Sequence, residues 1–410
     1  MLTQTLSEAS IHNIELEEKH GAHNYHPIPV VLERGKGVFV WDVDGKRYYD
    51  FLSGYSALNQ GHCHPRIINT LVEQAQKLTL TSRAFFNNKM GEFAKYITGY
   101  FGYDKVLPMN TGAEGVETAL KLTRRWGYDV KGITDGKAKI IVCENNFHGR
   151  TTTIVSFSSD PSAYTHFGPL TPGFEKIPYN NLAALEKALE DENVAGFLFE
   201  PIQGEAGVVV PDEGYLAGVR QLCTEYNVLM VADEIQTGLA RTGKMLACDH
   251  ENARPDVLIL GKALSGGTMP VSVVLADDAI MLNIKPGEHG STYGGNALAC
   301  AVTMEALQVL KDEHMAENAE RLGRLLRAEL ERLQSPFIKT VRGKGLLNAI
   351  VIEHTNPEAA WKLCLELKEN GLLAKPTHGD KIRFAPPLCI TEEQIHECIE
   401  IIAASLKVLE

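Results

Sequence analysis

The sequence reads "VLMVADEIQTGLARTGKMLACDHENARPDVLILGKALSGG" from Val228 to Gly267 and contains two short apolar runs. The first run ends in Asp233, and the second ends in Gly261 and Lys262. Near-continuous apolar runs of this length are typical of strands buried on both faces of a parallel sheet. Ligands of such sheets bind beyond the carboxyl ends of the strands. The stretch therefore predicts an α/β fold with a site that includes Asp233 and Lys262.

The same alternation of strands and helices extends outward from this stretch. Amphipathic stretches such as "GVETALKLTRRWG" separate the apolar runs, which indicates a mostly parallel central sheet covered on both faces. The predicted strands are 105–110, 139–144, 196–201, 228–234, 256–261 and 271–277.

The two ends of the chain have a different texture. The segment "VFVWDVDGKRYYDF" predicts a hairpin that turns at Asp44-Gly45. From about Ala297 a long helical run continues to Pro336, and shorter elements after it indicate a smaller α+β domain. We therefore predict an N-terminal segment (1–54) that packs with the small domain, a large domain (55–296) and a C-terminal small domain (297–410).

Composition narrows the function. The chain has 410 residues, of which 44% are hydrophobic and 22% charged, and its net charge of −12 argues against nucleic acid or an anionic membrane as a partner. No apolar stretch approaches the roughly 20 residues that span a bilayer. The eight cysteines form no C-x-x-C pair, which favours reduced thiols. The N-terminus shows no signal-peptide pattern, so we expect a cytoplasmic protein.

Asp233 and Lys262 each have a structural and a chemical interpretation. Asp233 could cap a helix or join a salt bridge, but it could also hold a cationic group of a cofactor, such as a protonated pyridine nitrogen. A lysine after a glycine is most often at the surface. Lys262, however, has apolar or tiny neighbours, and a desolvated lysine is a nucleophile that can form a Schiff base. The segment is not an ATP-binding P-loop, because Ala263 follows the lysine.

The segment "MNTGAEGVETALKL" (109–122) follows a predicted strand and begins an amphipathic helix. Thr111, Gly112 and Ala113 could bind a phosphate at the helix N-terminus. Thr111 could equally be an ordinary helix cap with Glu114 as its capping-box partner.

Four further groups admit both a functional and a structural interpretation. Phe147 could stack on a planar ring or belong to the core, and Arg150 could clamp a carboxylate or form a surface ion pair. Glu200 and Glu205 lie near a turn, but nothing else in the chain supports glycosidase chemistry. Arg383 in "KIRFAPPL" could be a second carboxylate clamp or a structural ion pair.

These motifs, in this order, resemble the class-III aminotransferases, which are pyridoxal-phosphate enzymes of fold type I. The most specific part is Ala232–Gly267, and the resemblance extends from about Tyr25 to Leu406. Within the family, "HNYHP", "GLARTGK" and "IKPGEHGSTYGGN" are most similar to members that act on ornithine. Acetylornithine and 4-aminobutyrate enzymes usually have a glycine where this chain has Leu239-Ala240.

The resemblance implies roles around a bound pyridoxal 5'-phosphate. Lys262 would be the Schiff-base lysine and the proton carrier, Asp233 would pair with the pyridine nitrogen, and Gln236 would approach the phenolic oxygen. Thr292 would reach the phosphate of the neighbouring subunit's cofactor, so the active unit would be a homodimer or a larger homo-oligomer. The expected cofactor-binding residues are Thr111, Gly112, Ala113, Phe147, Asp233, Gln236, Lys262 and Thr292.

The resemblance also implies how substrates bind. Tyr25 and Arg150 would hold the distant α-carboxylate of L-ornithine, and Tyr55 would orient the molecule. Glu205 would neutralise Arg383 while ornithine binds and would move away when 2-oxoglutarate binds. The expected substrate-binding residues are Tyr25, Tyr55, Arg150, Glu200, Glu205 and Arg383.

The implied reaction is a ping-pong transfer of the δ-amino group to 2-oxoglutarate. It yields glutamate 5-semialdehyde, which cyclises and links arginine degradation to proline biosynthesis. Acetylornithine or 4-aminobutyrate remains an alternative substrate. A non-enzymatic binding protein on this fold would have lost Lys262 or Asp233, and neither is lost. No metal is implied.

The chain departs from the family at two positions. Relatives often have alanine at the position of Gly115, and many animal enzymes have tryptophan at the position of His148. We expect neither position to touch a catalytic role.

Overall fold

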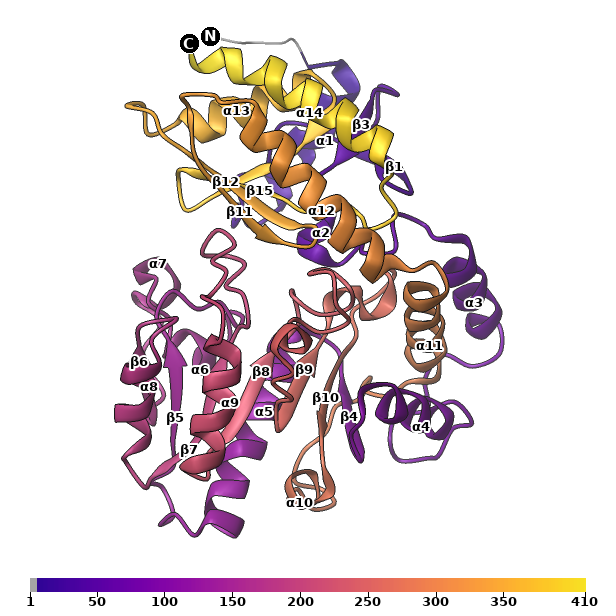
Figure 1. Ribbon diagram of the computed structural model, residues 1–410. Helices are drawn as coiled ribbons and strands as arrows, with labels where there is room; N and C mark the ends of the chain where they lie inside the picture. The colour runs from indigo at the N-terminus through magenta and orange to yellow at the C-terminus, as the bar shows by residue number, and fades with distance from the viewer. Residues whose placement is uncertain (1–5) are drawn as a thin grey trace.

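A seven-stranded sheet forms the centre of the larger body in the computed structural model, which describes residues 6–410 (Figure 1). All neighbouring strands are parallel except at β10, which is antiparallel to both of its neighbours. The predicted mostly parallel sheet is thus confirmed, with β6 as a strand that the sequence pattern did not reveal. In sheet order, the strands are β4 (Lys105–Met109), β10 (Ser272–Ala276), β9 (Val257–Leu260), β8 (Leu229–Asp233), β7 (Val194–Phe199), β5 (Lys139–Cys143) and β6 (Phe174–Ile177).

Helices cover both faces of this sheet because alternate strand residues point to opposite sides. Ile140 and Val142 pack in one cluster with α5 (Gly112–Trp126). Ile141 and Cys143 pack in the cluster on the other face, which includes α8 (Leu182–Leu189) and α9 (Tyr215–Glu225). Burial on both faces explains why the strands are apolar along their whole length.

The smaller body contains the C-terminal part of the chain (Figure 1). Its sheet consists of β11 (Ile338–Lys344), β12 (Leu347–Ile352), β15 (Lys381–Phe384) and β14 (Lys375–Thr377). The helices α12 (Met315–Arg332), α13 (Ala359–Glu369) and α14 (Glu392–Leu406) pack around it.

The long helical run expected from Ala297 is two helices, which corrects the sequence-based prediction. The first helix, α11 (Ala297–Asp312), ends before His314, and α12 starts at Met315. His314 has φ 50°, a left-handed conformation that the α-helix cannot continue through. No glycine or proline marks this break, so the sequence pattern did not predict it.

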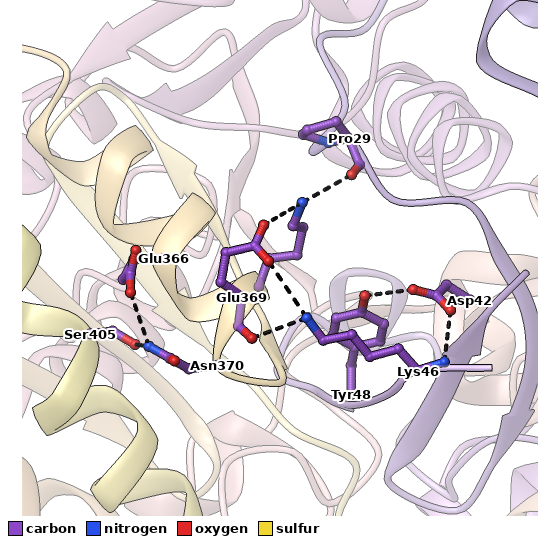
Figure 2. A network of polar contacts seen from close by, with 9 residues as sticks. Pro29, Asp42, Lys46, Tyr48, Glu366, Glu369, Asn370 and Ser405 are labelled. Atoms are coloured by element: carbon purple, nitrogen blue, oxygen red, sulfur yellow. Dashed lines mark hydrogen bonds and ion pairs between the residues drawn. The ribbon is translucent and has the colours of Figure 1, made fainter. Parts of the chain in front are cut away.

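The N-terminal segment packs against the C-terminal body. The predicted hairpin is present, since β2 (Phe39–Asp42) pairs antiparallel with β3 (Arg47–Asp50), and β3 also pairs in parallel with β13 (Leu372–Leu373). Figure 2 shows a polar network at this contact, in which Lys46 Nζ donates to the Glu369 backbone oxygen at 3.0 Å. The strand β1 (Leu32–Lys36) completes this sheet. Exact domain boundaries stay a prediction.

The remaining elements surround these layers. Within residues 6–410, no helix is long and apolar enough to cross a membrane. All eight cysteines are free, and six of them are buried. The remaining elements are α1 (Glu8–His20), α2 (Ser53–Ser56), α3 (Pro65–Ala75), α4 (Met90–Phe101), α6 (Thr152–Val155), α7 (Pro161–Tyr164), α10 (Asp278–Met281), η1 (Gly127–Lys131), η2 (Ala247–Glu251), η3 (Lys262–Ser265) and η4 (Lys407–Leu409).

Candidate active site

A cavity of about 210 Å³ is lined by residues that follow the carboxyl ends of strands of the central sheet. Four strands deliver residues to it: β8 ends at Asp233, β9 ends before Lys262, β7 leads into Glu200 and β5 leads into the segment that carries Phe147. The lining residues are Gly112, Ala113, Phe147, His148, Gly149, Glu200, Ile202, Glu205, Asp233, Ile235, Gln236, Thr237 and Lys262.

Lys262 enters the cavity from the turn that follows β9. Its φ of 45° lies in the left-handed region, which costs a non-glycine residue about 1 kcal/mol or more and fixes the direction of the side chain. Burial lowers the pKa of the Lys262 amine, Arg383 lowers it further, and the carboxylates of Glu205, Asp233 and Glu200 oppose the shift. A lowered pKa favours the neutral amine, which is the nucleophilic form.

Asp233 and His148 form a buried pair in the floor of the cavity. His148 Nδ1 lies 2.7 Å from Asp233 Oδ2, and Asp233 Oδ1 accepts a hydrogen bond from the Ile235 backbone N–H at 3.1 Å. Burial alone would lower the pKa of His148, but the hydrogen bond and charge of Asp233 outweigh it and raise the pKa. We expected His148 to be unconnected with any proposed catalytic residue. This expectation was wrong, because His148 directly contacts Asp233, the expected partner of the ring nitrogen.

Glu200 completes this floor. It is 7% exposed and accepts a hydrogen bond from the Phe147 backbone N–H at 3.0 Å. Burial raises the pKa of the Glu200 carboxyl to about 7, Asp233 and Glu205 add to the rise, and His148 opposes it. Glu200 thus holds the backbone of the aromatic residue in place. Its expected contact with substrate stays a prediction.

The N-terminus of α5 lies at one end of the cavity. Thr111 and Glu114 form the capping box that was the structural interpretation of this segment. Gly112 and Ala113 line the cavity from the first turn, while Thr111 is exposed and does not line it. Backbone N–H groups at a helix N-terminus attract anions, so this end suits a phosphate.

Phe147 and Arg150 are both exposed to solvent. The Phe147 side chain is 37% exposed, and the Arg150 guanidinium carbon lies 5.7 Å from the centre of its ring. Tyr25 is 70% exposed, with Lys375 Nζ at 6.0 Å from its ring centre. Arg150 and Tyr25 do not line the cavity itself, and their joint role in holding a carboxylate stays a prediction.

Glu205 and Arg383 meet across the boundary between the two bodies. Arg383 Nη1 donates to Glu205 Oε1 at 2.8 Å, and Arg383 Nη2 lies 3.4 Å from Glu205 Oε2. The side chain of Arg383 is 3% exposed, and that of Glu205 is 22% exposed. Burial would raise the pKa of Glu205, but Arg383, Lys262 and Gln236 together lower it, so the carboxylate is favoured.

Tyr55 covers this ion pair from an unusual turn. Ser53, Gly54, Tyr55 and Ser56 all have φ between 50° and 71°, so α2 is a left-handed turn. The Arg383 guanidinium carbon lies 5.0 Å from the Tyr55 ring centre, within the range of a cation–π contact. The turn begins after Asp50, whose Oδ1 accepts from the backbone N–H of Ser53 at 2.8 Å.

Thr292 is another expected site residue that does not line the cavity of its own chain. It is exposed on the loop before α11, beside Ser291, whose hydroxyl accepts a hydrogen bond from Asn110 at 2.7 Å. Its expected role at a neighbouring subunit's cofactor stays a prediction.

The residues of the cavity fit pyridoxal phosphate. The group needs an amine for its aldehyde, an anion beside its ring nitrogen, a surface for its ring and a site for its phosphate. Lys262, Asp233, Phe147 and the first turn of α5 offer these four features around one cavity. The donor chemistry therefore matches. The contact of His148 with Asp233 and the space at Gly204 were not predicted from the sequence. Gly204 leaves space for the Gln236 amide, as described below.

The comparisons with known proteins agree with this chemistry. Residues 20–406 match the family model described as aminotransferase class-III. The chain belongs to the class-III aminotransferase family.

Several class-III relatives are similar over nearly their whole length. The chain is 65% identical over 388 residues to ornithine aminotransferase, mitochondrial, of Rattus norvegicus, covering 95% of this chain and 88% of the relative. The crystal structure of the ornithine aminotransferase of Toxoplasma gondii ME49 matches with TM-score 0.96 and 50% identity, covering 98% of this chain and 96% of that one. The structure of an acetylornithine aminotransferase from Elizabethkingia anophelis matches with TM-score 0.89 and 60% identity, covering 97% and 99%.

Proposed function

We propose that this class-III aminotransferase transfers the δ-amino group of L-ornithine to 2-oxoglutarate, giving glutamate 5-semialdehyde and glutamate. The closed Glu205–Arg383 pair carries the proposal. A free arginine beside Lys262 would grip a carboxylate next to the reacting carbon and favour α-amines. With Arg383 neutralised, the site suits an amine whose own carbon carries no carboxylate, which is the δ-end of ornithine. Relatives described as ornithine aminotransferases support the choice of substrate.

We expect each residue near the reacting amine to have a separate role. Pyridoxal phosphate, when bound, supplies an electron sink for the carbon that carries the amine. Lys262, whose pKa is lowered chiefly by burial, is expected to move the proton from that carbon as a neutral base. Asp233, oriented by His148 at 2.7 Å, is expected to hold a proton at the ring nitrogen. Phe147 is expected to press on the ring face, and Gly112 and Ala113 to donate N–H groups to the phosphate.

The distant end of the substrate sets its orientation. We expect Arg150 and Tyr25 to hold the α-carboxylate of ornithine, with Tyr55 as a wall beside Arg383. In the second half-reaction, Arg383 binds the α-carboxylate of 2-oxoglutarate after Glu205 turns away. Both halves use one site in alternation, which is ping-pong kinetics.

The assembly and the cellular location are further parts of the proposal. A homodimer would let the partner subunit's Thr292 approach the phosphate, and the exposed aromatic residues Phe85, Phe86 and Tyr293 give apolar area to bury in such an interface. We propose a cytoplasmic enzyme, whereas the rat relative is called mitochondrial.

A panel of amino donors with 2-oxoglutarate tests the function. We expect ornithine to be the best donor, with glutamate formed and the cyclised product trapped as a coloured adduct. Acetylornithine is the second candidate, because a structure 60% identical to this chain is described as an acetylornithine aminotransferase. Faster turnover of acetylornithine or 4-aminobutyrate than of ornithine would reject the proposed substrate.

A further inference from the structure

The amide of Gln236 joins both charged partners of the Glu205–Arg383 pair. Arg383 Nη1 donates to Gln236 Oε1 at 3.2 Å, and Gln236 Nε2 donates to Glu205 Oε1 at 3.1 Å. Arg383 Nη1 also donates to the same Glu205 oxygen at 2.8 Å. The three side chains therefore form a closed ring of hydrogen bonds.

Gly204 provides the space that this amide occupies. A Cβ atom at Gly204 would overlap Gln236 Oε1 and lie 2.6 Å from Gln236 Cδ, and the three nearest atoms would all belong to Gln236. Gly204 is absent from the residues with positive φ, so its backbone conformation suits an alanine. The absence of a side chain is needed here for the amide and not for the backbone.

We propose that Gly204 is a specificity-determining position, because it lets the Gln236 amide hold the Glu205–Arg383 pair closed against substrates that carry a carboxylate beside the reacting carbon. The inference rests on the proposed function and extends it from the charged pair to the residues that set its equilibrium.

The geometry gives the amide a preference for the closed state. When Glu205 leaves Arg383, the bond from Gln236 Nε2 to Glu205 is lost, while Arg383 can keep its bond to Gln236 Oε1. Arg383 is 3% exposed, so water does not readily replace a lost partner. A hydrogen bond to a charged group that exists in only one of two states shifts their populations by about tenfold or more. The apparent affinity for a ligand of the open state falls by the same factor.

The test measures binding of glutarate, an unreactive dicarboxylate, to the holoenzyme by titration calorimetry. Glutarate has no amine or carbonyl to react, but its carboxylate requires the open state of Arg383. In Gly204→Ala the new methyl group displaces the amide, and we expect the Kd for glutarate to fall about tenfold. The selectivity for glutamate over ornithine in single half-reactions should rise by a similar factor.

A second variant and a control keep the result interpretable. Gln236→Ala removes the amide and leaves Gly204 intact, so it should shift glutarate binding in the same direction. Gly99→Ala, on the exposed side of α4, adds a methyl group with no atom within 4 Å and should leave the Kd unchanged. An unchanged or higher Kd for glutarate in Gly204→Ala, or a fall that Gln236→Ala does not reproduce, would overturn the inference. Because glutarate binding involves no amine transfer, failure to use ornithine would reject the proposed function and leave this test valid.

Discussion

The candidate active site has two groups of residues, here called walls, that are built in different ways. The cofactor wall, made of Lys262, Asp233, His148 and Glu200, comes from neighbouring strand ends of one sheet. The expected substrate wall, made of Tyr25, Tyr55, Glu205 and Arg383, comes from the N-terminal segment, a left-handed turn, a loop of the larger body and a strand of the smaller body. Of these four residues, Glu205 lines the cavity.

We expect the cofactor wall to determine the reaction chemistry and the substrate wall to determine which substrate is accepted. The ends of neighbouring strands of one sheet fix the backbone positions from which these groups extend. The substrate wall depends on one ion pair and a few side chains from separate segments, so it can exist in two arrangements at a modest energy difference. We therefore expect changes in the cofactor wall to abolish reaction, and changes in the substrate wall to redirect it.

The strongest test of the cofactor wall is Lys262→Ala. Without the amine, no group in the described cavity can take over both nucleophile and proton carrier, and we expect the half-reaction with ornithine to slow by about 10⁴-fold or more. Stopped-flow absorbance of the bound cofactor measures this rate.

Lys131→Ala is the matched control for that loss. Burial lowers the pKa of Lys131 too, but its ammonium group donates to the backbone oxygens of Val194 and Tyr226, away from the cavity. We expect this variant to lose stability and to keep its half-reaction rate. A half-reaction in Lys262→Ala within tenfold of the parent would show that another group carries the proton.

Glu200→Gln tests whether Glu200 of the cofactor wall is protonated, through the pH dependence of the free energy of unfolding. The pKa of Glu200 is raised to about 7 in the folded chain, against 4.5 for a free side chain, so the folded state holds a proton that the unfolded state releases. Stability therefore falls as pH rises from about 4.5 to about 7, by on the order of 3 kcal/mol in total. The glutamine variant should lack this fall, which melting temperatures across that pH range would reveal.

The titration of His148 also contributes to the pH dependence of stability, and an exposed carboxyl serves as the control. The raised pKa of His148 contributes stability that is complete below about pH 6.5 and is lost as pH rises through its folded pKa, so some decline above pH 6.5 should persist in the variant. Glu213→Gln, at the surface, should leave the parent profile intact. Parallel profiles for Glu200→Gln and the parent would contradict a neutral Glu200.

The two walls also differ in how far the sequence predicts them. Apolar runs that end in Asp233 and in Gly261-Lys262 are local signals, and the strands and the general chemistry followed from them. The contact of His148 with Asp233 spans 85 residues, and that of Arg383 with Glu205 spans 178 residues. No local pattern encodes such contacts. The ion pair was expected through family resemblance, and the contact of His148 with Asp233 was not predicted. The helix break at His314 was not predicted, because no sequence pattern indicates that a histidine will adopt a left-handed conformation.

Glu205→Gln tests whether the substrate wall selects the substrate. The variant removes the charge that neutralises Arg383 and keeps the size of the side chain. We expect the ratio of kcat/KM for glutamate over ornithine to rise by about 10- to 100-fold, since a charged hydrogen-bonded partner is lost only from the closed state. Gly204→Ala should move the ratio in the same direction by less. A ratio that stays constant in Glu205→Gln would mean that Arg383 does not bind the α-carboxylate.

Tyr55→Ile is the mildest change, and it tests the wall without touching its charges. The ring lies 5.0 Å from the Arg383 guanidinium carbon, and loss of such a contact costs about 0.5–2 kcal/mol. We expect kcat/KM for ornithine to fall about threefold to tenfold and other ω-amines, such as 4-aminobutyrate, to be accepted better, as a panel of donors would show. Tyr55→Phe keeps the ring and loses only the hydroxyl, so it should stay close to the parent if the ring face is what orients ornithine. Equal losses in the phenylalanine and isoleucine variants would instead assign the effect to the hydroxyl, and unchanged selectivity in both would remove Tyr55 from the substrate wall. We expect the Tyr55 variants to leave the chemistry at Lys262 unchanged. They therefore test substrate selection separately from the cofactor wall.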